Sequence, residues 1–157
     1  MAISAAPPAA ADIEITASSL AGRWVVASGF GGKECTEPGC RPTYDLVPCG
    51  DGWCGIEVKD GKTCGRTAFR LNAGAPGNSG RYGIEFAGSF ERADGTQAYV
   101  VRANLFANPT PQQPAPPLRL SVRGNTGGDF QPFRRAYPLH MVLSRDGDAL
   151  CAQPKVS

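Results

Sequence analysis

Apolar and polar residues alternate in short runs along most of the chain, the pattern of strands with one buried and one solvent-facing side. The clearest run covers residues 81–91. Its apolar side consists of Tyr82, Ile84, Phe86, Gly88 and Phe90. Its polar side consists of Arg81, Glu85, Ser89 and Glu91. We predict a strand here with one buried face and one face in water.

Similar runs recur along the chain, separated by turn sequences rich in Gly, Pro and Asp-Gly pairs. They include Arg23–Ser28, the segments around Leu46 and Ile56, Cys64–Leu71, Thr96–Phe106, the segment around Leu120, and the segment from Leu139 to Leu143. No window of helical length has a 3.6-residue period. About eight short strands joined mostly by hairpins predict an all-β fold, a single antiparallel barrel that leaves no exposed edges.

Two segments depart from this pattern. Residues 1–18 are rich in Ala, Pro and Ser without periodicity, and we expect a flexible N-terminal arm followed by a barrel domain over residues 19–157. Asn108–Pro117 carries too many prolines to be a central strand. We expect a stiff loop there with polyproline II character.

Six cysteines change the picture from a generic barrel to one with disulfide-stapled loops. Their spacing contains no C-x-x-C, and a single histidine leaves little for a Cys/His metal site, so we favour bridges over metal. Six cysteines allow 15 connectivities in principle. Short turn-forming loops between neighbouring cysteines select two pairs, and the remaining two form the third. The predicted bridges are Cys35–Cys40, Cys49–Cys54 and Cys64–Cys151.

Composition fits a protein exported to an oxidising compartment. The chain has 157 residues, of which 41% are hydrophobic and 19% charged, as in an ordinary globular domain. No apolar stretch is long enough to span a bilayer, and the formal charge of +2 is too small to favour nucleic acid. Met1–Ser4 lacks a basic region and prolines interrupt the following residues, so we expect a mature chain whose signal was removed. Paired cysteines then predict a periplasmic or secreted location.

The segment Leu20-Ala21-Gly22-Arg23-Trp24 resembles the G-x-W signature of lipocalins and related calycin barrels. That resemblance implies that Trp24 packs at the closed end of an eight-stranded barrel. It also implies that a basic residue near the last strand lies over the indole ring, a cation–π contact. Arg145 is the residue that matches this role. The alternative is that Trp24 is an ordinary core tryptophan at the start of a strand.

Two further segments are similar to a bacterial exported family that is known only as a lipocalin-like domain of unknown function. They are Pro48–Gly55, with the sequence PCGDGWCG, and Leu120–Gly127, with the sequence LSVRGNTG. The chain departs from that family by its extra cysteines and its proline loop. Leu20–Val25 also resembles the opening of periplasmic inhibitors of secreted metalloproteases, in which an N-terminal arm enters the protease cleft.

Residues with catalytic chemistry are few. The only histidine, His140, lies in a predicted strand, where a surface or packed role is the simpler interpretation than a catalytic base. Several aspartates directly precede glycine and are explained by turns rather than by acid–base chemistry. The Asp146–Asp148 run lacks the other ligands of a calcium loop. We therefore expect no enzyme activity, no metal and no cofactor.

The segment Phe130–Tyr137 has the most interactive character in the chain. Aromatic and arginine side chains together are typical of binding hot spots. We predict a ligand- or partner-binding surface made of Phe133, Arg134, Arg135 and Tyr137, with Arg119 and Arg123 adding positive charge nearby. The alternative is that Phe133 and Tyr137 plug one end of the barrel while the arginines stay in solvent.

The function expected from these features is that of an exported, non-catalytic binding protein. It binds either a small apolar molecule or a protein partner in the cell envelope or outside the cell, through the open end of the barrel. The loops Gly29–Pro42 and Asn108–Pro117 are expected to form the rim of that end. The alternatives are a periplasmic protease inhibitor that uses its N-terminal arm, and a structural envelope protein whose barrel is filled by side chains.

Overall fold

The computed structural model describes residues 15–30, 42–76, 83–92, 98–107, 109–126, 130 and 137–151, except for the side chains of 29, 30 and 76. Within these residues the only helix is the 3₁₀ turn η1 (Ala17–Leu20). The strands are β1 (Gly22–Phe30), β2 (Thr43–Cys49), β3 (Gly52–Lys59), β4 (Thr63–Leu71), β5 (Ala75–Pro76), β6 (Gly83–Glu91), β7 (Ala98–Phe106), β8 (Arg119–Asn125) and β9 (Leu139–Arg145).

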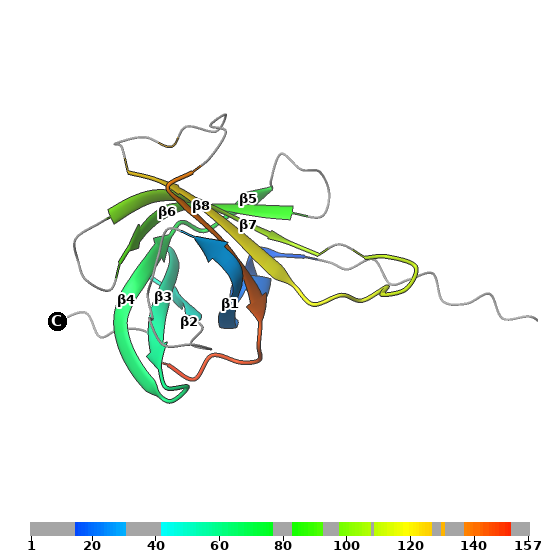
Figure 1. The fold of residues 1–157 in the computed structure, drawn as a ribbon, viewed down its shortest axis with the longest axis horizontal. Coiled ribbons are helices and arrows are strands. Elements are labelled where there is room, and N and C mark those ends of the chain that lie inside the picture. Colours follow the sequence, from blue (N-terminus) through cyan, green and yellow to red (C-terminus); the bar gives the residue numbers. More distant parts are fainter. Residues whose placement is uncertain are drawn as a thin grey trace, which may run out of the picture.

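These strands form a closed antiparallel barrel (Figure 1). Consecutive strands pair from β1 to β4 and from β5 to β9, β9 pairs with β1, and β4 pairs with β6. The barrel wall therefore has eight strands, and β5 is a short addition beside β6. The predicted all-β fold is confirmed, and the architecture is compatible with a lipocalin-like barrel.

Alternation of side chains places one apolar face of every strand inside the barrel. In β6, Phe86 and Phe90 are almost completely buried, while Glu85 and Ser89 lie on the outer face. The buried interior cluster consists of Leu20, Trp24, Tyr44, Leu46, Trp53, Ala68, Phe69, Leu71, Phe86, Phe90, Tyr99, Val101, Ala103, Leu105, Leu120, Val122, Leu139, Met141 and Leu143. Burial of these side chains is the main source of stability for the wall.

The seam between β4 and β6 completes the barrel with a register of only three residue pairs. Asn72, just after β4, extends this seam: its backbone N–H donates to the carbonyl of Ala87 at 2.8 Å. Its side-chain Oδ1 accepts the Ala87 N–H at 3.0 Å. Gly88 allows the two strands to approach, because a Cβ at this position would overlap the carbonyl oxygen of Arg70.

Trp24 lies near the start of β1, just after η1, and belongs to the interior cluster. The indole Nε1 donates to the Leu20 carbonyl at 2.9 Å, and both side chains are fully buried. Arg145 lies directly opposite Trp24 in the β1–β9 register, and its Nη2 donates to the Ala21 carbonyl at 3.2 Å. The described contacts of the Arg145 guanidinium are with the Ala21 carbonyl and, at 3.4 Å, with the Asp148 carboxylate. Its position over the indole ring stays a prediction.

The turn η1 belongs to the barrel rather than to a separate arm. Ile15 and Ala17 are partly buried against the interior cluster, and Leu20 is part of it. The expected boundary after residue 18 falls inside η1. Residues 1–14 lie outside the described part of the chain.

Two of the predicted disulfides are present. Cys49 and Cys54 join adjacent strands across the β2–β3 hairpin, with Cα atoms 5.7 Å apart. Cys64 and Cys151 join β4 to the C-terminal segment over a sequence separation of 87. Four residues separate the cysteines of the first pair, but β3 begins at Gly52, so the turn between the two strands has only two residues. The third predicted pair, Cys35–Cys40, lies outside the described residues.

The two loops expected to form a common rim leave the barrel at opposite ends. Strand directions alternate around the wall, so the β1–β2 connection emerges at the end where β8 finishes. The β7–β8 connection emerges at the other end, beside η1 and the last residue of β9. The expectation that Gly29–Pro42 and Asn108–Pro117 line one opening is therefore wrong.

The β7–β8 connection is a proline-rich hairpin that projects from the barrel (Figure 1). Thr110 and Gln113 exchange two backbone hydrogen bonds of 3.0 Å around the turn residues Pro111 and Gln112. The Thr110 hydroxyl accepts a further hydrogen bond from the Gln113 N–H. Prolines on both sides of this turn remove backbone donors, so the projection lacks the regular edge to which another strand would add.

Candidate functional site

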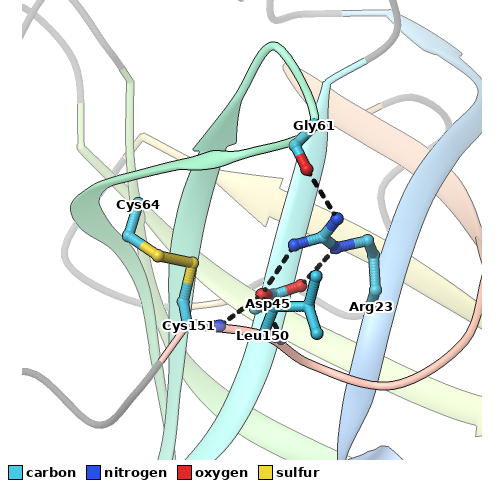
Figure 2. Close-up of a disulfide and its surroundings, with 6 residues drawn as sticks. All are labelled: Arg23, Asp45, Gly61, Cys64, Leu150 and Cys151. Carbon is cyan, nitrogen blue, oxygen red and sulfur yellow. Dashed lines mark hydrogen bonds and ion pairs between the residues drawn. A yellow bond between two sulfur atoms is a disulfide. The ribbon is translucent and has the colours of Figure 1, made fainter.

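A buried ion pair lies on the outer face of β1 and β2, under the C-terminal segment (Figure 2). The Asp45 side chain is 0% exposed, and it accepts hydrogen bonds from Arg23 Nε at 2.8 Å and from Arg23 Nη2 at 3.1 Å. The backbone N–H groups of Leu150 and Cys151 donate to its Oδ2, each at 2.8 Å. The remaining Arg23 nitrogen, Nη1, donates to the Gly61 carbonyl at 3.0 Å. Asp45 thus accepts four hydrogen bonds, and Arg23 donates from each of its three side-chain nitrogens.

These contacts fix the charge state of the pair. Burial alone favours the neutral acid, but hydrogen bonds from Arg23, Cys151 and Leu150, with the charge of Arg23, outweigh it and lower the pKa of Asp45. The hydrogen bond to Asp45 is the largest influence on Arg23 and raises the pKa of its guanidinium. A saturated carboxylate with a lowered pKa is unsuited to acid–base catalysis. We assign this pair to structure.

The C-terminal segment is held over this pair by apolar contacts and by a bridge. Cys151 is buried in a second cluster, outside the barrel wall, with Val47, Cys54, Ile56 and Val58. Its disulfide to Cys64 joins the segment to β4, as Figure 2 shows. We call residues 149–151 the strap. The strap covers the outer face of β2 and β3 and gives Asp45 two of its donors.

A different arrangement of arginines occurs on the outer face of β7, β8 and β9. Arg102 lies directly opposite Arg123 in the β7–β8 register, and Arg123 lies opposite His140 in the β8–β9 register. Directly opposed side chains have Cβ atoms about 5 Å apart, so two positive charges stand side by side here. Glu85 forms an ion pair with Arg102 at 3.1 Å. Within the described residues no carboxylate forms an ion pair with Arg123.

Two aromatic rings from the β8–β9 connection lie against these arginines. Phe130 and Tyr137 are stacked, with ring centroids 5.4 Å apart and an interplanar angle of 8°. The guanidinium carbon of Arg123 lies 5.8 Å from the Phe130 centroid and 5.4 Å from the Tyr137 centroid. That of Arg102 lies 5.5 Å from the Phe130 centroid. We call Arg102, Arg123, Phe130 and Tyr137 the arginine–aromatic cluster.

The structure brings together only part of the predicted binding surface. Tyr137 and Arg123 are in contact, whereas Arg119 lies at the far end of β8, opposite Phe106. Tyr137 stacks on Phe130 and is not part of the interior cluster, and the alternative that Phe133 and Tyr137 plug one end of the barrel stays a prediction. The other predicted residues, Phe133, Arg134 and Arg135, lie outside the described residues.

Sequence reasoning missed Arg102 and Asp45. Both lie at outward positions of predicted strands, where a charged residue is normally in water. Arg102 lies beside Arg123 because of the register between β7 and β8. No simple sequence rule gives the register of two strands that are joined by a hairpin of this length. A signal for Asp45 was present, since a bridge from Cys64 to Cys151 requires the C-terminal segment to cross the neighbouring strands.

The barrel interior is densely occupied by rings. Phe69 and Phe90 have centroids 4.6 Å apart, and Tyr44 approaches them edge-on at 5.0 and 6.0 Å. Trp53 contacts Phe86 further along the barrel at 6.5 Å. A hollow of about 340 Å³ lies instead on the outside, between the proline hairpin and the wall, lined by Phe106, Gln113, Pro116, Pro117, Arg119 and Val142.

The described part of the chain contains no group of three His, Cys, Asp or Glu side chains placed to hold a metal ion. In those ranges, no helix has the length and apolar character needed to cross a bilayer.

Comparison with known proteins gives no assignment. No protein-family model, no curated protein and no solved structure matches the chain. Any function must therefore be argued from the site itself.

Proposed function

We propose that this chain is an exported, non-catalytic binding protein that engages a protein partner through the outer face of β7, β8 and β9. The observation that carries the proposal is the arginine–aromatic cluster, in which Arg123 contacts two stacked rings and has no carboxylate partner among the described residues. Arginine and tyrosine are the residues most enriched at the centres of protein interfaces. A cluster of this kind on an outer wall is suited to recognition rather than to stabilising the barrel.

Packing of the interior supports a protein partner over a small apolar ligand. A barrel of eight strands either is filled by its own side chains or holds one small molecule. The rings of Tyr44, Phe69, Phe90 and Tyr99 form a continuous set of contacts across the described interior. A ligand there would have to displace packed aromatic side chains, each of which contributes about 3–5 kcal/mol in a typical core.

The disulfides support a location outside the reducing cytosol. Two bridges hold the described barrel, and bridges of this kind persist mainly in oxidising compartments. We place the protein in the periplasm or among secreted proteins. Kinship with lipocalin-like exported proteins is supported by the closed barrel and by the position of Arg145 opposite Trp24.

A ligand titration and a partner assay test the proposal together. A fluorescent fatty-acid-type probe should give no saturable change in tryptophan emission, and saturable micromolar binding would favour a ligand carrier instead. The immobilised full chain should retain a protein from the extracytoplasmic fraction of the source organism, and that protein, once purified, should rebind with a measurable Kd. Arg123→Glu should abolish rebinding, and Arg119→Glu, with the same charge change on the same strand, should not. Equal rebinding by both variants would remove the β7–β9 face from the proposal.

A further inference from the structure

We infer that the arginine–aromatic cluster is a carboxylate-binding site, and that its occupant is an acidic segment of a protein partner. The inference rests on the proposed function and adds the chemistry that the partner must present. It follows from three properties of the cluster: the positions of its charges, the way its rings hold them, and the small area over which positive charge is concentrated.

The first property is an unbalanced pair of like charges. Arg102 and Arg123 are direct cross-strand neighbours, and like charges in this arrangement oppose each other. Glu85 balances Arg102 at 3.1 Å, but within the described residues no acid balances Arg123. An incoming carboxylate beside Arg123 would relieve this repulsion. Among the described residues, no carboxylate already uses the binding energy that such a contact would supply.

The second property is that the rings hold the guanidinium groups by their faces. Cation–π contact uses the π surface of Phe130 and Tyr137, with guanidinium carbons 5.4–5.8 Å from the centroids. Hydrogen bonding to a carboxylate uses the N–H groups at the edges of the guanidinium plane. The two interactions do not compete. The rings therefore restrict the arginine side chains before binding, which lowers the entropy lost when a carboxylate arrives.

The Arg23–Asp45 pair shows the contrast within the same molecule. There the guanidinium edge is occupied by both carboxylate oxygens and by the Gly61 carbonyl. For Arg123 the described contacts are with ring faces only. Arg23 thus has its guanidinium edge occupied, whereas no contact among the described residues occupies the edge of Arg123.

The third property distinguishes an acidic protein segment from a polyanion such as nucleic acid. The chain has 16 basic and 14 acidic residues, and Glu85 lies immediately beside the cluster. Binding of a nucleic-acid backbone needs an extended basic face that neutralises several phosphates. A site of two arginines bordered by an acid suits one or two carboxylates. The aromatic rings add apolar surface for side chains that flank those carboxylates.

The test measures binding of a short fluorescein-labelled poly-L-glutamate to the full oxidised chain by anisotropy at low salt. Wild type should bind saturably, and affinity should fall as salt is raised. Arg123→Gln should weaken binding roughly tenfold or more, because a charge-assisted hydrogen bond is lost. The matched control is Arg119→Gln, which removes the same charge from the outer face of the same strand but lacks the stacked rings. It should change the affinity by less than about twofold, as expected of a distant screened charge.

Two further variants separate the site from general charge and from misfolding. Arg123→Lys keeps the charge and loses the planar fork, so it should recover only part of the affinity. Phe130→Leu keeps an apolar side chain and should weaken binding about two- to fivefold through loss of cation–π contact. Circular dichroism and urea midpoints identify any variant whose loss of affinity reflects unfolding. If Arg123→Gln is such a variant, the affinity of Arg123→Lys relative to wild type decides whether the planar guanidinium is needed.

Several outcomes would overturn the inference. No saturable binding by wild type would do so, as would equal losses in Arg123→Gln and Arg119→Gln, which would indicate nonspecific attraction. If single-stranded DNA or heparin bound more tightly than poly-L-glutamate, and this binding depended on Arg123, the ligand would be a phosphate or sulfate polyanion and not an acidic protein segment. Partner capture with unaltered rebinding by Arg123→Gln would leave the proposed function standing without this chemistry. Arg123-dependent polyglutamate binding with no partner retained would support the site and contradict the proposed function.

Discussion

Arg23 and Arg123 both extend from the outer face of the barrel wall, and the protein holds them in different ways. Arg23 is enclosed: its side chain is 12% exposed, and Asp45 and Gly61 accept its hydrogen bonds. Arg123 lies against two rings without an acid partner in the described part of the chain. The comparison shows that arginines on the outer wall can be enclosed by hydrogen bonds or packed against ring faces, depending on what covers them.

The strap is the cause of this difference. Residues 149–151 cross the outer face of β2 and β3, exclude water from Asp45, and supply two N–H donors. On the β7–β9 face the covering groups are Phe130 and Tyr137, which contact Arg123 by their π faces, and no described residue forms an ion pair with the Arg123 edge. The predictions that follow alter one side of this comparison at a time.

Removal of the strap's bridge should have the largest effect on stability. Replacing both Cys64 and Cys151 by serine should lower the free energy of unfolding by about 4–5 kcal/mol, because the bridge closes a long loop in the unfolded chain. Replacing both Cys49 and Cys54, whose loop is short, should cost only about 2 kcal/mol. Urea unfolding of the two variants gives the comparison. Similar losses for both would show that the strap is not held mainly by its bridge.

Loss of the Asp45 carboxylate should cause the next largest decrease in the free energy of unfolding. Asp45→Ala leaves Arg23 without its partner and two buried N–H groups without an acceptor, so we expect a loss of about 3 kcal/mol. The matched control is Asp148→Ala, which removes an aspartate that is 94% exposed and contacts Arg145 only at 3.4 Å. That change should cost less than about 1 kcal/mol. Equal midpoints for the two variants would contradict the structural role of the enclosed pair.

Acid should weaken the enclosed pair specifically. The pKa of Asp45 in the folded state lies below its value in the unfolded chain, so its stabilising contribution is complete above the unfolded value of about 4. That contribution is lost as pH falls through the lowered folded-state pKa. Urea midpoints measured from neutral to acid pH should therefore fall more steeply for wild type than for Asp45→Asn. Parallel pH profiles would show that Asp45 titrates alike in both states.

Substitution of Arg123 should have almost no effect on stability. Arg123→Gln removes two cation–π contacts but also relieves repulsion with Arg102, and each effect is about 0.5–1 kcal/mol. We expect the free energy of unfolding to change by less than about 1 kcal/mol. Arg23→Gln, the same substitution in the enclosed pair, should cost about 3 kcal/mol. An equally large loss at Arg123 would make the arginine–aromatic cluster structural.

The sequence predicts the barrel well because its interior follows a local rule. In β6, β7 and β9 every second residue is apolar, and the alternation alone assigns Phe86, Val101 and Leu143 to the interior, as observed. The bridges Cys49–Cys54 and Cys64–Cys151 are also confirmed. The turn between Cys49 and Cys54 is so tight that Trp53 lies in β3 and contacts Phe86.

The candidate site is less predictable because it depends on contacts between distant segments. Asp45 is buried by residues more than 100 positions further along the chain, so its neighbours Tyr44 and Leu46 give no hint of its environment. Arg102 faces Arg123 because of the β7–β8 register. This register cannot be read from the sequence, because the two strands are joined by a long proline hairpin and not by a short turn of defined type. The aromatic segment after β8 was recognised, but its position outside the wall follows only from the fold.

The Cys64–Cys151 bridge has a mechanical consequence. It closes a covalent ring that contains nearly all of β4 and the whole of β5 to β9, with a sequence separation of 87. Force applied at the two chain ends can extend only the residues outside this ring. A chain of that separation would reach roughly 300 Å if fully extended. Single-molecule pulling should show a contour length shorter by about this amount in the oxidised than in the reduced protein. Equal contour lengths would mean that the ring is not closed.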